Sequence, residues 1–557
     1  MLKRNSKTFE ILLIISFVLV YAFLLKKSLW TLPMPSDPTR YIGSVVWKSM
    51  CEYFPYLDRV MIPVGVRLVS FFFSKVYIAG MVYIALVNIL ILTIGILYCF
   101  RQSGFWAAVA FGVLLPGSYL MTGYATYVYT DQTLALYTLL AFIFFFQPKT
   151  RWLHPVFVAG IFSALALFSK VMGLATVLFF AGYLIFQKKG RDLLGFGGGL
   201  ICGSIIPLGL TGILFGHQSL IFVFKSIADN FIGNLTFGGP NTNLVSHFDI
   251  LVSPKTLPVF ISLFICVGAY KRVASRRLFL MSIAHILLLS FIYAVSGRRG
   301  LIIDNYMYPA FVFAGLGLAV YLGEIFKDAA VGVKQTRGVL FGLLCLAFLM
   351  AGFFLAHRFD PTDFFTESAK ITLPSVLRWF YTLGPLAVVS LLAGVEYSRS
   401  AKVALAFLLL TSLWATAYGG GLGIAKAASD RHRAGFYYKA APVLSEVGAE
   451  SFSVYVERWN QYAPILPVPR VAWIYHLFIQ EKYPRQYDPA YFSMEKKEEP
   501  PSKIQVIDKK QKLFFTRGPL ILTDNPLLIK RLFPKTVFVK NIPTDDGQLF
   551  VLDISSR

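Results

Sequence analysis

The chain alternates long apolar runs with short polar segments over most of its length. Runs of roughly 17 to 25 apolar residues have the length that a helix needs to cross a bilayer. The pattern predicts about 13 membrane-spanning helices, placed at residues 9–29, 78–100, 104–122, 131–147, 153–170, 172–187, 192–214, 256–270, 278–295, 305–326, 338–356, 379–396 and 401–420. We therefore expect an α-helical polytopic membrane protein.

Basic residues between the runs predict the direction of each helix. They recur in alternate loops, which hold Arg101, Lys149, Arg151, Lys188, Lys189, Arg191, Lys271, Arg272, Arg276, Arg277, Lys327, Lys334, Arg337, Arg399 and Lys402. Loops of this kind stay on the inner side of a membrane. The long segments 30–77, 215–255 and 357–378 then lie outside. The expectation is a multi-pass protein of the inner or plasma membrane.

The composition changes after Gly419-Gly420-Gly421 to that of a soluble protein. Residues 452–456 and 537–540 have the apolar, β-branched character of strands, and residues 526–532 have that of a helix. We expect residues 1–425 to form the transmembrane domain and residues 430–557 to form a small α/β domain. Because the predicted number of spans is odd, this second domain should be extracytoplasmic.

Composition and charge exclude several classes of protein. The chain is 56% hydrophobic and 15% charged, which is more apolar surface than a soluble core can bury. Its net charge of +24 would suit a nucleic-acid partner, but much of the charge lies in the loops between apolar runs, where the positive-inside rule explains it. Neither the cysteines nor the histidines have the spacing of a disulfide framework or a zinc site. The expected partners are membrane lipids, without nucleic acid.

The first candidate for chemistry is the stretch Ser36-Asp37-Pro38-Thr39-Arg40-Tyr41, in the first outer segment. On a helix that begins near Ser36, Asp37, Arg40 and Tyr41 share one face. A carboxylate that can accept a proton would lie beside a guanidinium that can bind phosphate. The alternative is structural, with Asp37 as a helix cap in an ion pair with Arg40.

Further ionisable residues are expected at the same face of the membrane. Asp131 opens an apolar run, where it could also be a helix cap. Lys170 lies between two apolar runs, and Arg298 and Arg299 occupy a short outer loop. Outer cations oppose the positive-inside trend, which favours the binding of an anion. For Lys170, the alternative is a side chain that snorkels to the interface.

The order of these residues resembles that of the polytopic C-type (GT-C) glycosyltransferases, in the group of protein O-mannosyltransferases and the lipid A aminoarabinose transferase. In that group an acidic residue of the first outer loop precedes Arg-Tyr, a Thr/Ser-Asp opens the fourth span, a Lys follows the fifth, and Tyr-x-x-Pro begins a late span. The matching residues here are Asp37, Arg40, Tyr41, Thr130, Asp131, Lys170, Tyr306 and Pro309. The resemblance covers about residues 10–330. One departure is the apolar stretch Val60-Met61-Ile62-Pro63, where the group often has a polar residue and where Arg59 is the nearest cation.

The resemblance implies an enzyme that transfers a hexose or pentose, with inversion, from a polyprenyl-phosphate donor to a hydroxyl group of a lipid, glycan or protein. Asp37 would be the general base, and Asp131 would orient the acceptor or help to bind a divalent metal ion. The donor phosphate and sugar would be bound by Arg40, Tyr41, Arg59, Lys170, Arg298, Arg299 and Tyr306.

Two alternatives to an enzyme remain. A transporter or lipid flippase would also have many spans, but such proteins place charges near the midplane and are built from repeats. Here the notable ionisable residues collect at one face and the sequence has no internal repeat. The second alternative, a scaffold that has lost its activity, is suggested by the apolar residues 60–63.

Overall fold

The computed structural model describes residues 2–25, 41, 45, 59–73, 76–116, 118–125, 127–147, 154–217, 219–221, 223–225, 227, 272–296, 304–329, 452–455, 520–523, 525–544 and 547–553. The chain divides into two compact units. The first contains the described helices α1 to α15, and the second contains the described strands and helix α22.

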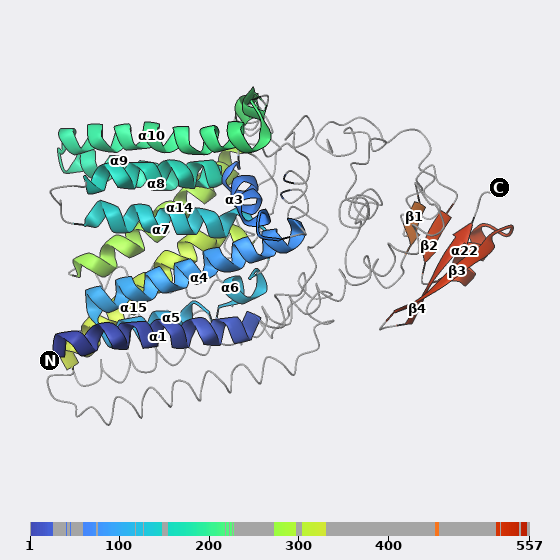
Figure 1. The fold of residues 1–557 in the computed structure, drawn as a ribbon, viewed down its shortest axis with the longest axis horizontal. Coiled ribbons are helices and arrows are strands. Elements are labelled where there is room, and N and C mark those ends of the chain that lie inside the picture. The colour runs from blue at the N-terminus through green and yellow to red at the C-terminus, as the bar shows by residue number, and fades with distance from the viewer. Residues whose placement is uncertain are drawn as a thin grey trace. The chain divides into compact units, whose positions relative to one another are not determined.

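The first unit is a bundle of apolar helices that lie side by side (Figure 1). Its main helices are α1 (Leu2–Leu25), α4 (Val76–Ser103), α5 (Phe105–Leu114), α7 (Thr130–Phe146), α8 (Pro155–Ser169), α9 (Leu174–Phe186), α10 (Gly190–Phe215), α14 (Val273–Ser296) and α15 (Tyr308–Ala329). Each lies on an expected span. Among the described residues, α4 and α10 combine at least 18 residues with the hydropathy required for crossing a membrane. The expected spans 256–270, 338–356, 379–396 and 401–420 lie outside the described residues.

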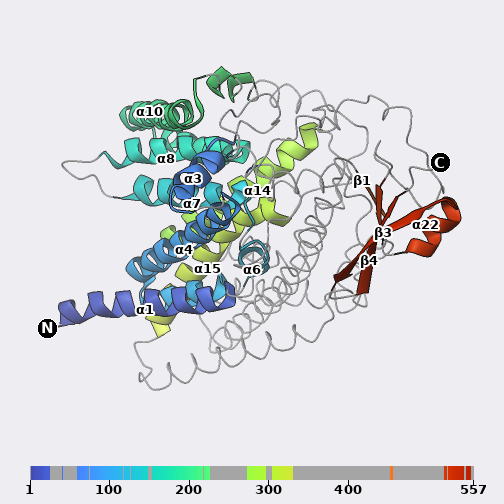
Figure 2. The ribbon, with the colours of Figure 1, turned by 45° about the vertical axis from the view of Figure 1, so that its right-hand side comes forward.

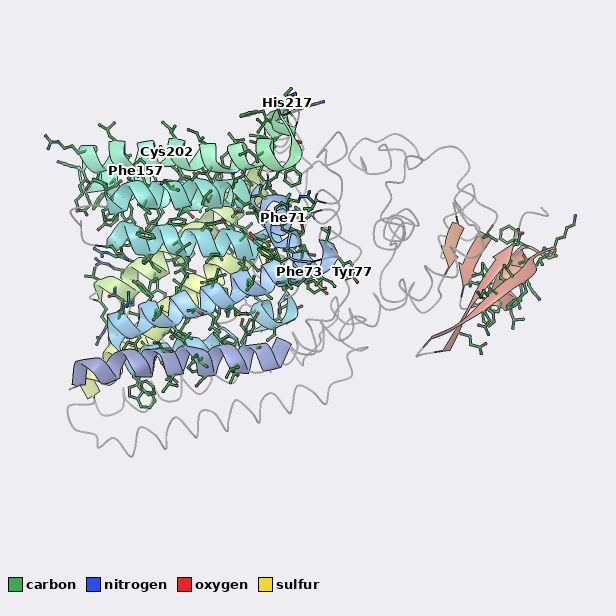
Figure 3. All side chains as sticks on the ribbon, viewed as in Figure 1. Phe71, Phe73, Tyr77, Phe157, Cys202 and His217 are labelled. Atoms are coloured by element: carbon green, nitrogen blue, oxygen red, sulfur yellow. The ribbon has the colours of Figure 1, made fainter. Side chains whose placement is uncertain are left out.

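Short helices gather at one end of this bundle, as the two ribbon views show for α3 (Met61–Ser70) and α6 (Tyr119–Gly123) (Figures 1 and 2). The 3-10 helices η1 (Val171–Gly173) and η3 (Asp304–Met307) lead into α9 and α15. The helix α3 falls within the predicted outer segment 30–77. It is followed by the exposed side chains of Phe71 and Phe73, which lie at this end of the bundle (Figure 3).

The expected span 104–122 is not one helix. The helix α5 ends at Leu114, two residues before Pro116. Proline cannot donate a backbone hydrogen bond, and it disfavours helical geometry at the residue before it. A new helix, α6, then starts after Ser118, whose Oγ accepts a hydrogen bond from the Met121 backbone N–H at 3.2 Å. The chain therefore turns at this end of the bundle before it enters α7.

Glycines allow α8 and α10 to approach closely. A Cβ atom at Gly199 would collide with the backbone oxygen of Phe157, and one at Gly203 would lie 2.6 Å from the oxygen of Ile161. The side of α10 away from these glycines is exposed at Ile201 and Ile205, and Cys202 on the same helix is exposed as well (Figure 3). The glycines of α10 are thus a packing feature of the kind that lets membrane helices associate.

The second unit contains a four-stranded sheet with the order β1-β2-β4-β3. Its strands are β1 (Phe452–Tyr455), β2 (Leu520–Thr523), β3 (Val537–Thr544) and β4 (Gly547–Asp553). Strands β1 and β2 are parallel, and the remaining pairs are antiparallel. The helix α22 (Pro526–Leu532) packs Ile529 against Ile521 and Leu552. The expected strands 452–456 and 537–540 and helix 526–532 are confirmed, whereas β2 and β4 were not expected.

Candidate functional site

Asp131 and Lys170 form a buried ion pair. The Lys170 Nζ donates to Oδ1 of Asp131 at 2.6 Å, and the two residues are 4% and 1% exposed. Asp131 is the second residue of α7, and Lys170 directly follows α8. A short contact between two buried charges holds both side chains in fixed positions, because either charge would be costly to bury alone.

Tyr306 completes this cluster from a third part of the chain. The Lys170 Nζ lies 3.5 Å from the centre of the Tyr306 ring, where the negative face of an aromatic ring attracts a cation. Tyr306 belongs to η3, just before α15. The structure therefore brings together three of the residues that the sequence predicted for the site.

The geometry argues against the structural alternatives for this pair. The cap position of α7 is occupied by Tyr129, whose own side chain makes no capping hydrogen bond. The Asp131 carboxylate instead accepts a hydrogen bond from Lys170. The Lys170 side chain is not directed to solvent, since it is 5% exposed. An acid in the first turn of α7 is also stabilised by the positive end of the helix dipole.

Buried polar side chains hold the chain just before Asp131. Gln132 Nε2 donates to the carbonyl oxygen of Tyr124 at 3.1 Å, and Asn88 Nδ2 donates to that of Ala125 at 3.2 Å. The Tyr308 hydroxyl in turn donates to Asn88 Oδ1 at 2.7 Å. Sequence reasoning missed these residues. The signal for Asn88 was a single amide inside an otherwise apolar run, and such a group needs a partner in a membrane protein.

The tyrosines of this segment pack against one another. The Tyr127 and Tyr129 rings are stacked, with an interplanar angle of 2° and centres 5.8 Å apart. Tyr124 meets both rings edge-on, at 5.5 and 5.7 Å. Aromatic pairs of this geometry are stabilising beyond the area they bury. The segment that leads into α7 is thus fixed by ring packing as well as by hydrogen bonds.

The other expected site residues are described only in part. Asp37, Arg40, Arg298 and Arg299 lie outside the described residues. Tyr41 is buried. Arg59 is partly buried and stands just before α3, where residues 60–66 are all buried. The apolar stretch 60–63 is therefore the packed first turn of α3.

The residues described here do not form a metal site. No three His, Cys, Asp or Glu side chains come together among them. His285 lies within the bundle instead, where its Nε2 is 3.4 Å from Thr176 Oγ1 and its ring stacks on Phe313. These two contacts make His285 a packing residue of the bundle.

The C-terminal end of α7, away from Asp131, lies against basic residues. At that end the Arg277 guanidinium lies 4.3 Å from the centre of the Phe146 ring and donates to the Tyr183 hydroxyl at 3.4 Å. Arg272 lies 3.7 Å from Glu324. Both arginines come from a loop that the charge pattern places inside. The candidate site and this basic cluster therefore lie at opposite ends of α7.

Comparison with family models gave no match, and neither did comparison with curated protein sequences. Two solved structures share the fold. One is ArnT from Cupriavidus metallidurans bound to undecaprenyl phosphate, with a TM-score of 0.55, 14% identity and 98% of each chain covered. The other is the same protein in the apo state, with a TM-score of 0.53, 14% identity and 99% of each chain covered. The chain therefore has the polytopic helical GT-C fold, with the small C-terminal sheet, that its sequence predicts.

Proposed function

We propose that this protein is a membrane glycosyltransferase that moves a sugar from a polyprenyl phosphate to an acceptor hydroxyl. The observation that carries the proposal is the buried cluster of Lys170, Asp131 and Tyr306 at one end of the bundle. A likeness in fold to a protein solved with undecaprenyl phosphate supports it. A transporter would instead place such charges near the middle of its helices.

Lys170 would stabilise the leaving phosphate of the donor. As the bond between the sugar and the phosphate breaks, the phosphate oxygen gains charge, and a positioned ammonium stabilises that charge. Asp131 and Tyr306 hold the ammonium, which limits the reorganisation needed during the reaction. Asp131 then acts as a positioning residue through Lys170. Further phosphate and sugar contacts would come from Arg40, Tyr41, Arg59, Arg298 and Arg299.

Asp37 would be the general base. The acceptor oxygen attacks the anomeric carbon, its proton passes to the Asp37 carboxylate, and the bond to the phosphate oxygen breaks on the opposite side of that carbon. The products are the glycosylated acceptor, with inverted configuration, and a polyprenyl phosphate. General-base assistance of this kind typically contributes about 10² to 10⁴-fold. The reaction would take place on the extracytoplasmic side.

The proposal is tested with purified full-length protein in liposomes and a panel of polyprenyl phosphates that carry pentoses, aminopentoses or hexoses. We expect transfer from at least one donor and loss of that transfer in Asp37→Asn. Lys170→Ala should weaken donor binding, whereas Lys189→Ala, an exposed lysine just before α10, should not.

Two results would contradict the proposal. If Asp37→Asn inserts normally and transfers sugar at the parental rate, Asp37 is not the base. If neither the parental protein nor its lipid extract yields any bound polyprenyl phosphate, and no donor of the panel is consumed, the transferase assignment fails.

A further inference from the structure

The connection between α6 and α7 depends on two buried residues from other helices. Asn88 in α4 donates to the carbonyl oxygen of Ala125, and Tyr308, the first residue of α15, donates to the same Asn88 amide. Asn88 is fully buried and Tyr308 is 1% exposed. Both side chains are shielded from bulk water, and a hydrogen bond in such surroundings is electrostatically stronger than in water.

The Tyr308 hydroxyl and the Ala125 carbonyl oxygen hold the two ends of the Asn88 amide. An amide side chain has an acceptor oxygen at one end and N–H donors at the other. A hydroxyl donor on Oδ1, at 2.7 Å, turns the Nδ2 donors toward Ala125. Residues 127–129 then run without helix into Thr130, where α7 begins. The position of Ala125 therefore affects the position of the next carboxylate, Asp131.

The short sequence Tyr306-Met307-Tyr308 contributes to the positions of both Lys170 and Asp131. Tyr306 places its ring against the Lys170 ammonium. Tyr308 acts on Asp131, through Asn88 and the segment that precedes Asp131. Because the two tyrosines are separated by one residue, a single short stretch of chain aligns the lysine with the aspartate.

We propose that Asn88 and Tyr308 are positioning residues that act through residues 124–129 to hold Asp131 against Lys170. The inference rests on the proposed transferase function and adds to it the means by which the phosphate-binding lysine is kept in place. Removal of the Tyr308 hydroxyl takes away one of the hydrogen bonds that orient the Asn88 amide. A displacement of about 1 Å at a catalytic group can lower a rate about 10²-fold.

Hydrogen exchange of the full-length protein in detergent tests the structural step. The variants are Tyr308→Phe and Asn88→Leu, and the control is Tyr137→Phe. Tyr137 stacks on Phe162, and its hydroxyl has no hydrogen bond within the described part of the chain. We expect backbone amides of residues 124–129 to exchange at least about tenfold faster in both variants than in the control. Equal exchange in all three proteins would overturn the inference.

Kinetics test the consequence for transfer. In Tyr308→Phe we expect kcat to fall about 10 to 100-fold, while KM for the donor rises by less than in Lys170→Ala. The kcat of the double variant should be no lower than that of the less active single variant, because both residues act as one unit. A raised KM with unchanged kcat would mean that Tyr308 contacts the donor and would overturn positioning. If the parental protein transfers no sugar, the proposed function fails, and the exchange measurement still decides this inference.

Discussion

Replacing one member of the Asp131–Lys170 pair should be far more costly than replacing both. The two atoms are 2.6 Å apart, which at an effective dielectric constant of about 20 gives an attraction of about 6 kcal/mol. Burying the two ions costs several kcal/mol each, so the net contribution of the pair is much smaller. Lys170→Met removes the attraction and keeps the cost of burying the carboxylate. We expect it to lower the free energy of unfolding by about 3–5 kcal/mol.

A double-mutant cycle measures this effect. Lys170→Met, Asp131→Leu and the double variant are unfolded reversibly in mixed detergent micelles, and the free energies of unfolding are compared. The double variant should recover most of the loss of the single variants, because no buried charge of the pair remains. The control is Lys189→Met, at an exposed lysine just before α10, with an expected change within about 0.5 kcal/mol.

The reasoning is refuted if the two single changes simply add in the double variant. Additive losses would mean that the contact carries no coupling energy, since independent sites add within about 0.5 kcal/mol. Lys170 would then be held by its other surroundings, and Asp131 could not be the residue that positions it.

The other predictions concern the packing of α10, the aromatic contact, the second unit and the topology. Gly199→Leu should displace α10 from α8 and lower the melting temperature, whereas Gly197→Leu, where no atom lies within 4 Å of a Cβ, should not. Tyr306→Phe should keep donor affinity within a factor of about three, while Tyr306→Leu should weaken it by about 0.5–2 kcal/mol, as binding titrations can measure. Ile529→Ala should destabilise the C-terminal unit by about 2–5 kcal/mol and expose it to limited proteolysis. A reporter fused after Gly421 should show activity on the extracytoplasmic side, and a cytoplasmic signal would contradict the predicted number of spans.

Hydropathy was sufficient to predict the described bundle because each membrane helix must be apolar along most of its length. Together with the basic residues of the loops, it also predicted that Asp131 and Lys170 lie at the same face. Their direct contact could not be predicted, because apolar runs do not show which helices are neighbours. The helix break before Pro116 was missed for a simpler reason, since the apolar pattern continues through the break.

The hydrogen bond between Asn88 and Tyr308 marks the limit of sequence reasoning. The two residues are 220 positions apart, and each lies in or next to an apolar run. A single polar residue in such a run signals that a partner exists, but only the packing of α4 against α15 identifies it. In the second unit, β2 and β4 were missed because short strands without a clear alternation are hard to distinguish from loops.

The depth of the charged cluster connects the fold with the proposed donor. Asp131 lies in the first turn of α7, and Lys170 follows the last residue of α8, so both charges are near helix ends. A polyprenyl phosphate keeps its chain among the lipid tails and its phosphate at the level of the headgroups. Cations near the ends of membrane helices meet that phosphate without drawing it into hydrocarbon, where a charge is costly. A pair near the middle of the helices would suit passage across the membrane instead, so the position of Asp131 and Lys170 is itself an argument for transfer at the surface.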